Sequence, residues 1–143
     1  SGKWPELGKD YGWHNLQHHS GNPDALERMS HIDLRQMEMF ANFIKRLEQA
    51  GESDASMLDN SLVLFGSGMN NGDGFTNGGG AHGTRNLPML LAGGRALGIR
   101  QGQHLHFPNS KTPLCNLFVT LLQAAGVETD QFSDANSTLT GMS

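Results

Sequence analysis

Hydrophobic residues recur every three or four positions from Leu26 to Leu47, with polar residues between them. This spacing places the apolar side chains along one face of a helix. The segment begins with Asn22 and Pro23, which favour the cap and the first position of a helix, and a glycine follows its end. We therefore predict a long amphipathic helix over residues 24–50.

A second helix is predicted over residues 112–125. Thr112 and Pro113 supply a cap and a first helical position, and Gly126 follows the predicted end. The apolar positions between them again recur at helical intervals. They are Leu114, Leu117, Phe118, Leu121 and Leu122.

Two short runs of nearly continuous apolar residues, 61–65 and 88–92, have the length and composition of buried strands. A third segment, 103–107, alternates enough to be a strand nearer an edge. Strands that are apolar on both faces need cover on both sides, and the connection between the first two is long enough for a crossover. The sequence thus predicts one α/β domain over residues 3–143, with a largely parallel sheet covered by helices.

The charge and hydropathy of the chain limit its partners. The formal net charge is -4, and the lysines and arginines form no cluster that would bind a phosphate backbone, so we expect no nucleic-acid partner. No apolar run approaches the roughly 20 residues that cross a bilayer, which predicts no membrane span. The single cysteine, Cys115, cannot form an intramolecular disulfide.

Three histidines lie close together near the start of the chain, in a segment without clear periodicity. His14 and His18 are four residues apart, so a helical turn would place both imidazoles on one side, where they could bind one metal ion. His19 would be a further ligand or would support the ligands from outside. Imidazole suits several transition metals, and we predict a divalent ion, with zinc favoured. The alternative is a polar surface loop whose histidines only form hydrogen bonds.

Residues 66–83 are dominated by glycine and asparagine, which predicts a long loop. Its glycines would let backbone amides approach an anion closely. We predict that Arg85, with Ser67 and Asn70, binds the anion, and that His82 completes the metal site begun by the first histidines. A flexible surface loop without a ligand is the alternative, because Asn-Gly and Asp-Gly pairs are common turn formers.

These motifs follow one another in a recognisable order. The blocks are His14-x-x-x-His18-His19, then Leu64-Phe65-Gly66-Ser67-Gly68-Met69, His82, Asn86-Leu87-Pro88-x-Leu90-Leu91-Ala92-Gly93-Gly94 and Thr112-Pro113-Leu114-x-Asn116-Leu117. This order covers most of the chain and resembles the C-terminal part of the bacterial HxxSHH family, a group of exported proteins of unknown function. One departure is Gln17, which stands where the family has a serine.

That family is similar to the alkaline phosphatase and sulfatase superfamily, whose fold is a layered α/β sheet with metal ligands at strand ends. The resemblance implies an exported protein with an alkaline-phosphatase-like C-terminal portion and metal-dependent hydrolysis of small phosphate or sulfate esters. The superfamily usually has Asp-His where residues 67–69 stand, and its nucleophile lies in an N-terminal half without a counterpart here.

Ser1 and Gly2 look like a cloning remnant, so we expect a missing N-terminal half of the same protein, and no residue of this chain is predicted as the nucleophile. A second hypothesis gives the chain no catalytic role. In that interpretation it is a metal-stabilised binding module for an extracellular polymer.

Overall fold

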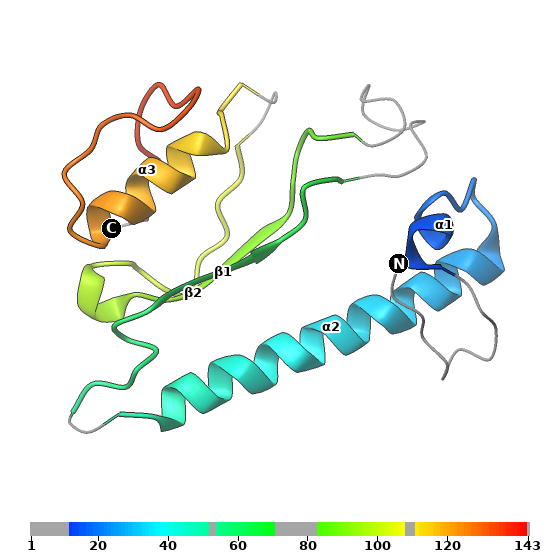
Figure 1. The fold of residues 1–143 in the computed structure, drawn as a ribbon, viewed down its shortest axis with the longest axis horizontal. Coiled ribbons are helices and arrows are strands. Elements are labelled where there is room, and N and C mark those ends of the chain that lie inside the picture. The colour runs from blue at the N-terminus through cyan, green and yellow to red at the C-terminus, as the bar shows by residue number, and fades with distance from the viewer. Residues whose placement is uncertain (1–11, 52–53, 71–82, 108–110, 143) are drawn as a thin grey trace. The chain divides into compact units, whose positions relative to one another are not determined.

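The structure is a computed structural model that describes residues 12–51, 54–70, 83–107 and 111–142. The elements follow in the order α1 (Trp13–Gln17), α2 (Pro23–Gln49), β1 (Leu62–Gly66), β2 (Met89–Gly93), the 3-10 helix η2 (Arg95–Leu97) and α3 (Cys115–Ala124) (Figure 1). Contacts within the chain define two compact units, Ser1–Asn42 with Gly66–Pro88, and Phe43–Phe65 with Met89–Ser143. Each unit is described by itself below.

The long amphipathic helix is confirmed. α2 begins at Pro23, one residue before the predicted start, and the Oδ1 atom of Asn22 accepts a hydrogen bond from the backbone N–H of Ala25 at 3.1 Å. This bond satisfies one of the N–H groups that the first turn of a helix leaves without a partner. Although α2 has 27 residues, neither it nor any other helix of the described residues is long and apolar enough to cross a membrane.

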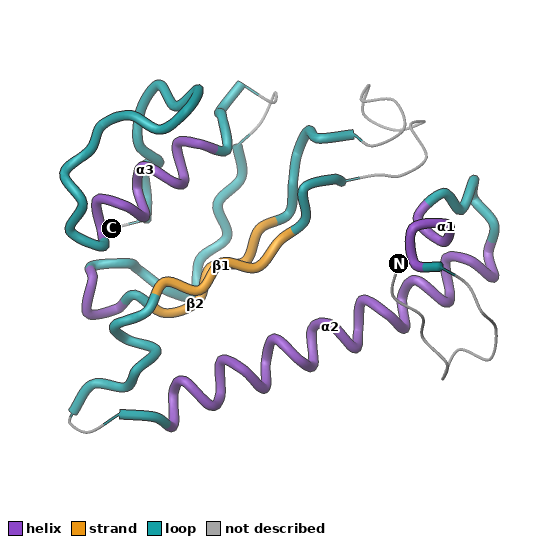
Figure 2. The backbone as a smooth tube through the Cα atoms, viewed as in Figure 1, coloured by secondary structure: helices purple, strands orange, loops and turns teal. Residues whose placement is uncertain are grey.

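The two predicted strands pair with each other, but the predicted sheet is wrong. β1 and β2 form a two-stranded antiparallel sheet (Figure 2). The expected fold was an α/β domain with a largely parallel sheet covered by helices, similar to the C-terminal portion of alkaline phosphatases. The described residues instead form a small helical structure with this one antiparallel pair.

Hydrogen bonds past both ends of the strands show that the two segments run in opposite directions. The N–H of Gly94, after β2, donates to the carbonyl of Leu58, before β1, at 3.2 Å. Past the opposite ends of the strands, the N–H of Asn70 donates to the carbonyl of Gly83 at 2.8 Å. The chain therefore returns alongside itself as a hairpin. A parallel pair would need a crossover to the opposite end of the sheet, and a long connection permits a crossover without requiring one.

The core of the second unit lies where the sheet meets α3. Its buried members are Ile99, Leu117 and Met142. Partly buried residues pack against them from β1, β2, α3 and the loops, namely Leu62, Leu64, Leu91, Leu105, Leu114, Leu121, Ala124 and Leu139. α3 is thus confirmed as a helix, although it is shorter than the predicted range 112–125.

The third predicted strand is absent: residues 103–107 form neither helix nor strand. Leu105 packs against the core, whereas His104 and His106 on either side of it are exposed. The alternation in this sequence therefore reports which side chains face the core. It does not report backbone pairing, because an extended segment can alternate in this way without a neighbouring strand.

The C-terminal tail is fixed by side chains of α3. Asn116 is only 3% exposed, and its Nδ2 donates to Oδ1 of Asn136 at 3.0 Å and to Oγ of Ser137 at 3.3 Å. Its own Oδ1 accepts the backbone N–H of Asn136 at 3.0 Å. One turn further along α3, Oγ1 of Thr120 accepts the N–H of Leu139 at 2.8 Å. Residues 127–142 are thus held in place without forming helix or strand.

Candidate metal centre

The short helix α1 presents two histidines on one side. Successive residues of an α-helix are about 100° apart, so His14 and His18 lie about 40° apart around the axis, and Leu16 lies on the opposite side. Leu16 is 4% exposed, whereas His14 is exposed and His18 is half-buried. Burial of Leu16 therefore anchors the helix with the histidine side directed outward.

The two imidazoles meet through their Nε2 atoms. The Nε2 of His14 and the Nε2 of His18 are 3.3 Å apart, with ring centroids 4.8 Å apart and ring planes at 73°. Two nitrogens bound to one tetrahedral zinc ion, each about 2.0–2.1 Å from the metal, are separated by about 3.3–3.4 Å. The same distance allows an N–H···N hydrogen bond between neutral imidazoles. The pair can thus share either a proton or a metal ion.

A tight turn follows this pair. His18 is the C-cap of α1, with φ -92° and ψ 51°, and the carbonyl of His19 accepts the N–H of Asn22 at 2.7 Å. Ser20 and Gly21 between them have φ values of 47° and 76°. Two successive positive φ values enclosed by such a hydrogen bond describe a type I′ turn. Nδ1 of His19 accepts the N–H of Gly21 at 3.0 Å.

The predicted anion-binding residues are described, but His82 lies outside the described residues. Ser67, Asn70 and Arg85 all belong to the first unit, and all three are exposed. The hydroxyl of Ser67 accepts the N–H of Met69 at 3.2 Å, so this side chain stabilises its own loop. Within the described residues no group of three or more His, Cys, Asp or Glu could hold a metal ion.

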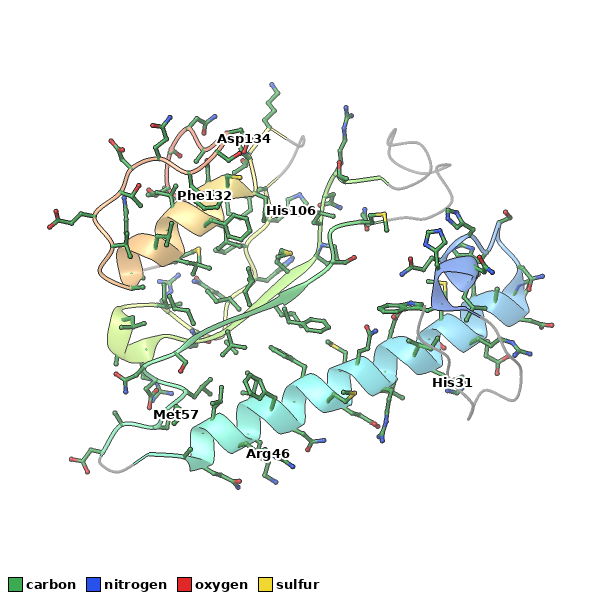
Figure 3. The ribbon with its side chains drawn as sticks, viewed as in Figure 1. His31, Arg46, Met57, His106, Phe132 and Asp134 are labelled. Atoms are coloured by element: carbon green, nitrogen blue, oxygen red, sulfur yellow. The ribbon has the colours of Figure 1, made fainter. Side chains whose placement is uncertain are left out.

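Other histidines of the described residues are exposed side chains on other segments. His31 projects from α2 and is exposed (Figure 3). His106, in the second unit, is also exposed (Figure 3). Among the described residues, the histidines whose rings meet are His14 and His18.

The turn after α2 contains an acidic hollow that the sequence reading missed. The hollow measures about 380 Å³, and its lining includes Glu48, Asp54, Asp59 and Arg95. Hydrogen bonds from the hydroxyl and the backbone N–H of Ser56, together with Arg95, lower the pKa of Asp59 below its ordinary value. A serine three residues before an aspartate is a pattern that stabilises turns, and it was visible in the sequence. These contacts stabilise the turn.

Cys115 at the start of α3 is not an activated nucleophile. The Asp134 carboxylate accepts a hydrogen bond from the thiol, and this contact, followed by desolvation, raises the pKa of Cys115 above its ordinary value. The thiol therefore stays protonated at neutral pH, whereas nucleophilic cysteines need a lowered pKa. Phe132 lies two residues before Asp134 in the C-terminal tail (Figure 3). Its ring meets that of Phe118 in α3 edge to face, with centroids 5.5 Å apart.

Among the described residues, the pair of His14 and His18 is the group of side chains on which we base a functional proposal. Its nitrogen spacing fits one transition-metal ion, and it combines an exposed His14 with a half-buried His18. The likeness to the HxxSHH family rests on the motifs alone. Comparisons with protein-family models, with curated proteins and with solved structures found no match for this chain.

Proposed function

We propose that this chain is a metal-binding domain in which His14 and His18 bind one divalent transition metal ion, with zinc expected. The observation that carries the proposal is the 3.3 Å separation of the two Nε2 atoms. It equals the separation that two ligands of one tetrahedral ion require, which is about 3.3–3.4 Å. Binding would therefore need little rearrangement of the two rings, because the buried Leu16 already orients α1.

The chemistry of the donors fits the same ion. Neutral imidazole is a common ligand of zinc, copper, iron and nickel. Two imidazoles fill half of a tetrahedral shell, so further ligands are needed, and the sequence predicts His82 as the third. A bound ion of this kind can polarise an ester oxygen or lower the pKa of a water molecule.

The reaction proposed for this site is hydrolysis of a small phosphate or sulfate ester, and it rests on the family resemblance. Arg85 would fork onto two oxygens of the anion, because a planar guanidinium suits a tetrahedral oxyanion, while Ser67 and Asn70 would add hydrogen bonds. The resemblance also supports export and a separate N-terminal half that would supply the nucleophile.

Zinc titration by isothermal calorimetry tests the metal site. We expect one zinc ion per chain, and His14→Ala and His18→Ala should each weaken binding at least about tenfold, since one coordination bond is lost. The matched control is His31→Ala, which removes an exposed imidazole from α2 and should leave the affinity unchanged. The metal-binding proposal fails if the wild-type chain does not bind zinc, or if His31→Ala has the same effect as the other two substitutions.

The melting temperature tests the metal site again, and an ester assay separates the hydrolase from the polymer-binding module. A chelator should lower the melting temperature of the zinc-loaded chain, because a ligand that binds only the native state stabilises it. Aryl phosphate and aryl sulfate esters then test hydrolysis, and Arg85→Ala should weaken sulfate binding. Arg35→Ala is the control, since Arg35 pairs with Glu38 on α2 at 2.8 Å. Zinc binding without hydrolysis of either ester, also when the N-terminal half that the resemblance implies is joined to this chain, would support the polymer-binding module.

A further inference from the structure

The C-terminal tail carries a motif that lies outside the proposed metal site. Asn136, Ser137 and Thr138 form the tripeptide Asn-x-Ser/Thr, the acceptor of N-linked glycosylation. Asn136 is the one asparagine of the whole sequence with a serine or threonine two positions after it. Asp134 stands two positions before it, so the segment also matches the longer pattern Asp/Glu-x-Asn-x-Ser/Thr that bacterial oligosaccharyltransferases select.

The surface position of the tripeptide suits an acceptor. Asn136, Ser137 and Thr138 are all exposed, and they lie in a segment that forms neither helix nor strand. They belong to the second unit, as does α3, against which this segment is held. A glycan is bulky and hydrophilic, so its attachment point has to face water. This requirement is met here.

Hydrogen bonds with Asn116 determine which atom of the Asn136 side chain stays available. The backbone N–H of Asn136 needs an acceptor, so the atom of Asn116 that it meets at 3.0 Å is Oδ1. The other polar atom of Asn116 is then Nδ2, a donor, and it meets Oδ1 of Asn136 at 3.0 Å. Nδ2 of Asn136, the atom that a glycan would occupy, makes no hydrogen bond within the described part of the chain.

A glycan on Nδ2 leaves the contacts of the tail intact. A glycosylated asparagine is still an amide, which keeps its carbonyl oxygen as an acceptor. The bond from Asn116 to Oδ1 of Asn136 and the bond from the Asn136 backbone can therefore both persist. The folded tail and a glycan at Asn136 are thus compatible.

We propose that Asn136 is the acceptor site of an N-linked glycan. The donor class is an oligosaccharide joined through a diphosphate to a lipid. Nδ2 of Asn136 forms a bond to C1 of the first sugar and loses one proton, while the bond from C1 to the diphosphate oxygen breaks and the lipid diphosphate leaves. The inference rests on the export that is part of the proposed function, because bacterial oligosaccharyltransferases act outside the cytoplasm, and it does not rest on the metal site.

Mass spectrometry of the exported chain tests the site. The full chain, joined to a cleavable export signal, is produced in a bacterial host that contains an oligosaccharyltransferase, its lipid-linked donor and a reference acceptor protein. We expect the wild type to gain the mass of one glycan, and fragmentation of the tail peptide should locate it at Asn136. Asn136→Gln and Thr138→Ala should abolish the gain, whereas Thr138→Ser, which keeps the hydroxyl, should retain it.

Two further variants sharpen the test. Asn60→Gln is the matched control, because Asn60 is also exposed and is followed directly by a serine, but Leu62 stands two positions after it. This variant should be glycosylated as the wild type is. Asp134→Asn keeps the shape of the side chain and removes its charge, so the glycosylated fraction should fall if the bacterial enzyme selects the acid.

The proposal is overturned if the wild type stays unmodified while the reference acceptor in the same cells is glycosylated. It is also overturned if the modification persists in Asn136→Gln or Thr138→Ala, and full modification of Asp134→Asn would overturn the match to the bacterial pattern. These results are separate from those of the zinc titration, since His14 and His18 belong to the first unit and the titration uses the unmodified chain.

Discussion

Replacing Asn116 by alanine should loosen the C-terminal tail of the second unit. The substitution removes three hydrogen bonds, two to the side chains of Asn136 and Ser137 and one from the backbone N–H of Asn136. Each such bond contributes about 1 kcal/mol net, and the alanine also leaves a small void where a buried side chain stood. We therefore expect a loss of about 2–3 kcal/mol in the free energy that holds this part of the tail in place.

Amide hydrogen exchange measured by NMR reports this loss locally. A change of about 2–3 kcal/mol corresponds to about 30- to 150-fold faster exchange of the Asn136 amide. The Leu139 amide is an internal reference, because Thr120 and not Asn116 accepts its hydrogen bond. Tryptophan fluorescence would not serve, since Trp4 and Trp13 both belong to the other unit.

Ser137→Ala is the matched control for this substitution. Of the three bonds to Asn116 it removes the longest, at 3.3 Å, and it also removes the bond from the Ser137 hydroxyl to the carbonyl of Thr138. Because Ser137 is exposed and the Asn136 amide keeps its own bond to Asn116, exchange at Asn136 should rise by no more than about fivefold. The reasoning is refuted if Asn116→Ala leaves the Asn136 amide as protected as it is in the wild type. It is also refuted if the two substitutions have equal effects.

Two further substitutions test the hairpin and the turn after α2. Gly93 and Gly98 share a φ of 83°, but a Cβ atom on Gly93 would lie 2.5 Å from the carbonyl oxygen of Leu58, whereas one on Gly98 would meet nothing within 4 Å. In circular-dichroism melts, Gly98→Ala should therefore cost about 1–2 kcal/mol and Gly93→Ala at least about 2 kcal/mol more; equal losses would show that the close approach is unimportant. Ser56→Ala should lower the melting temperature at neutral pH, because the hydroxyl holds the pKa of Asp59 below its ordinary value, and such a carboxyl stabilises the fold above the unfolded-state pKa. That difference from the wild type should shrink as the pH falls through the lowered pKa of Asp59, to the part that comes from the bond of the Asp59 backbone N–H to the Ser56 hydroxyl, and a difference that stays the same in acid would contradict this origin.

The helices could be predicted because their signals are local. Asn22 and Pro23 start α2 by direct contact with its first turn, and the apolar positions repeat within the same segment. The direction of the strands is a different kind of property. It depends on whether the chain after Gly66 returns to the same end of β1 or crosses to the other, and composition alone does not encode that choice.

In the candidate site, too, the features set by neighbouring residues could be predicted and the others could not. The four-residue spacing of His14 and His18 predicted that their rings would share one side of a helix, and the structure places them together, while the metal itself stays a prediction. The acceptor role of His19 could not be predicted, because it depends on the positive φ of Ser20. The burial of Asn116 was equally invisible, since its partners lie about 20 residues away in the sequence.

The hairpin has a consequence for how this chain can vary. Because β1 and β2 are antiparallel, the segment between Gly66 and Met89 leaves and re-enters the sheet at the same end, so its length is not tied to the length of the sheet. Doubling such a connection costs only about 0.6 kcal/mol in loop-closure entropy. Insertions and deletions here would leave the register of Leu64 and Leu91 against the core unchanged. This stretch can therefore gain or lose binding groups in evolution while the scaffold beneath it stays constant.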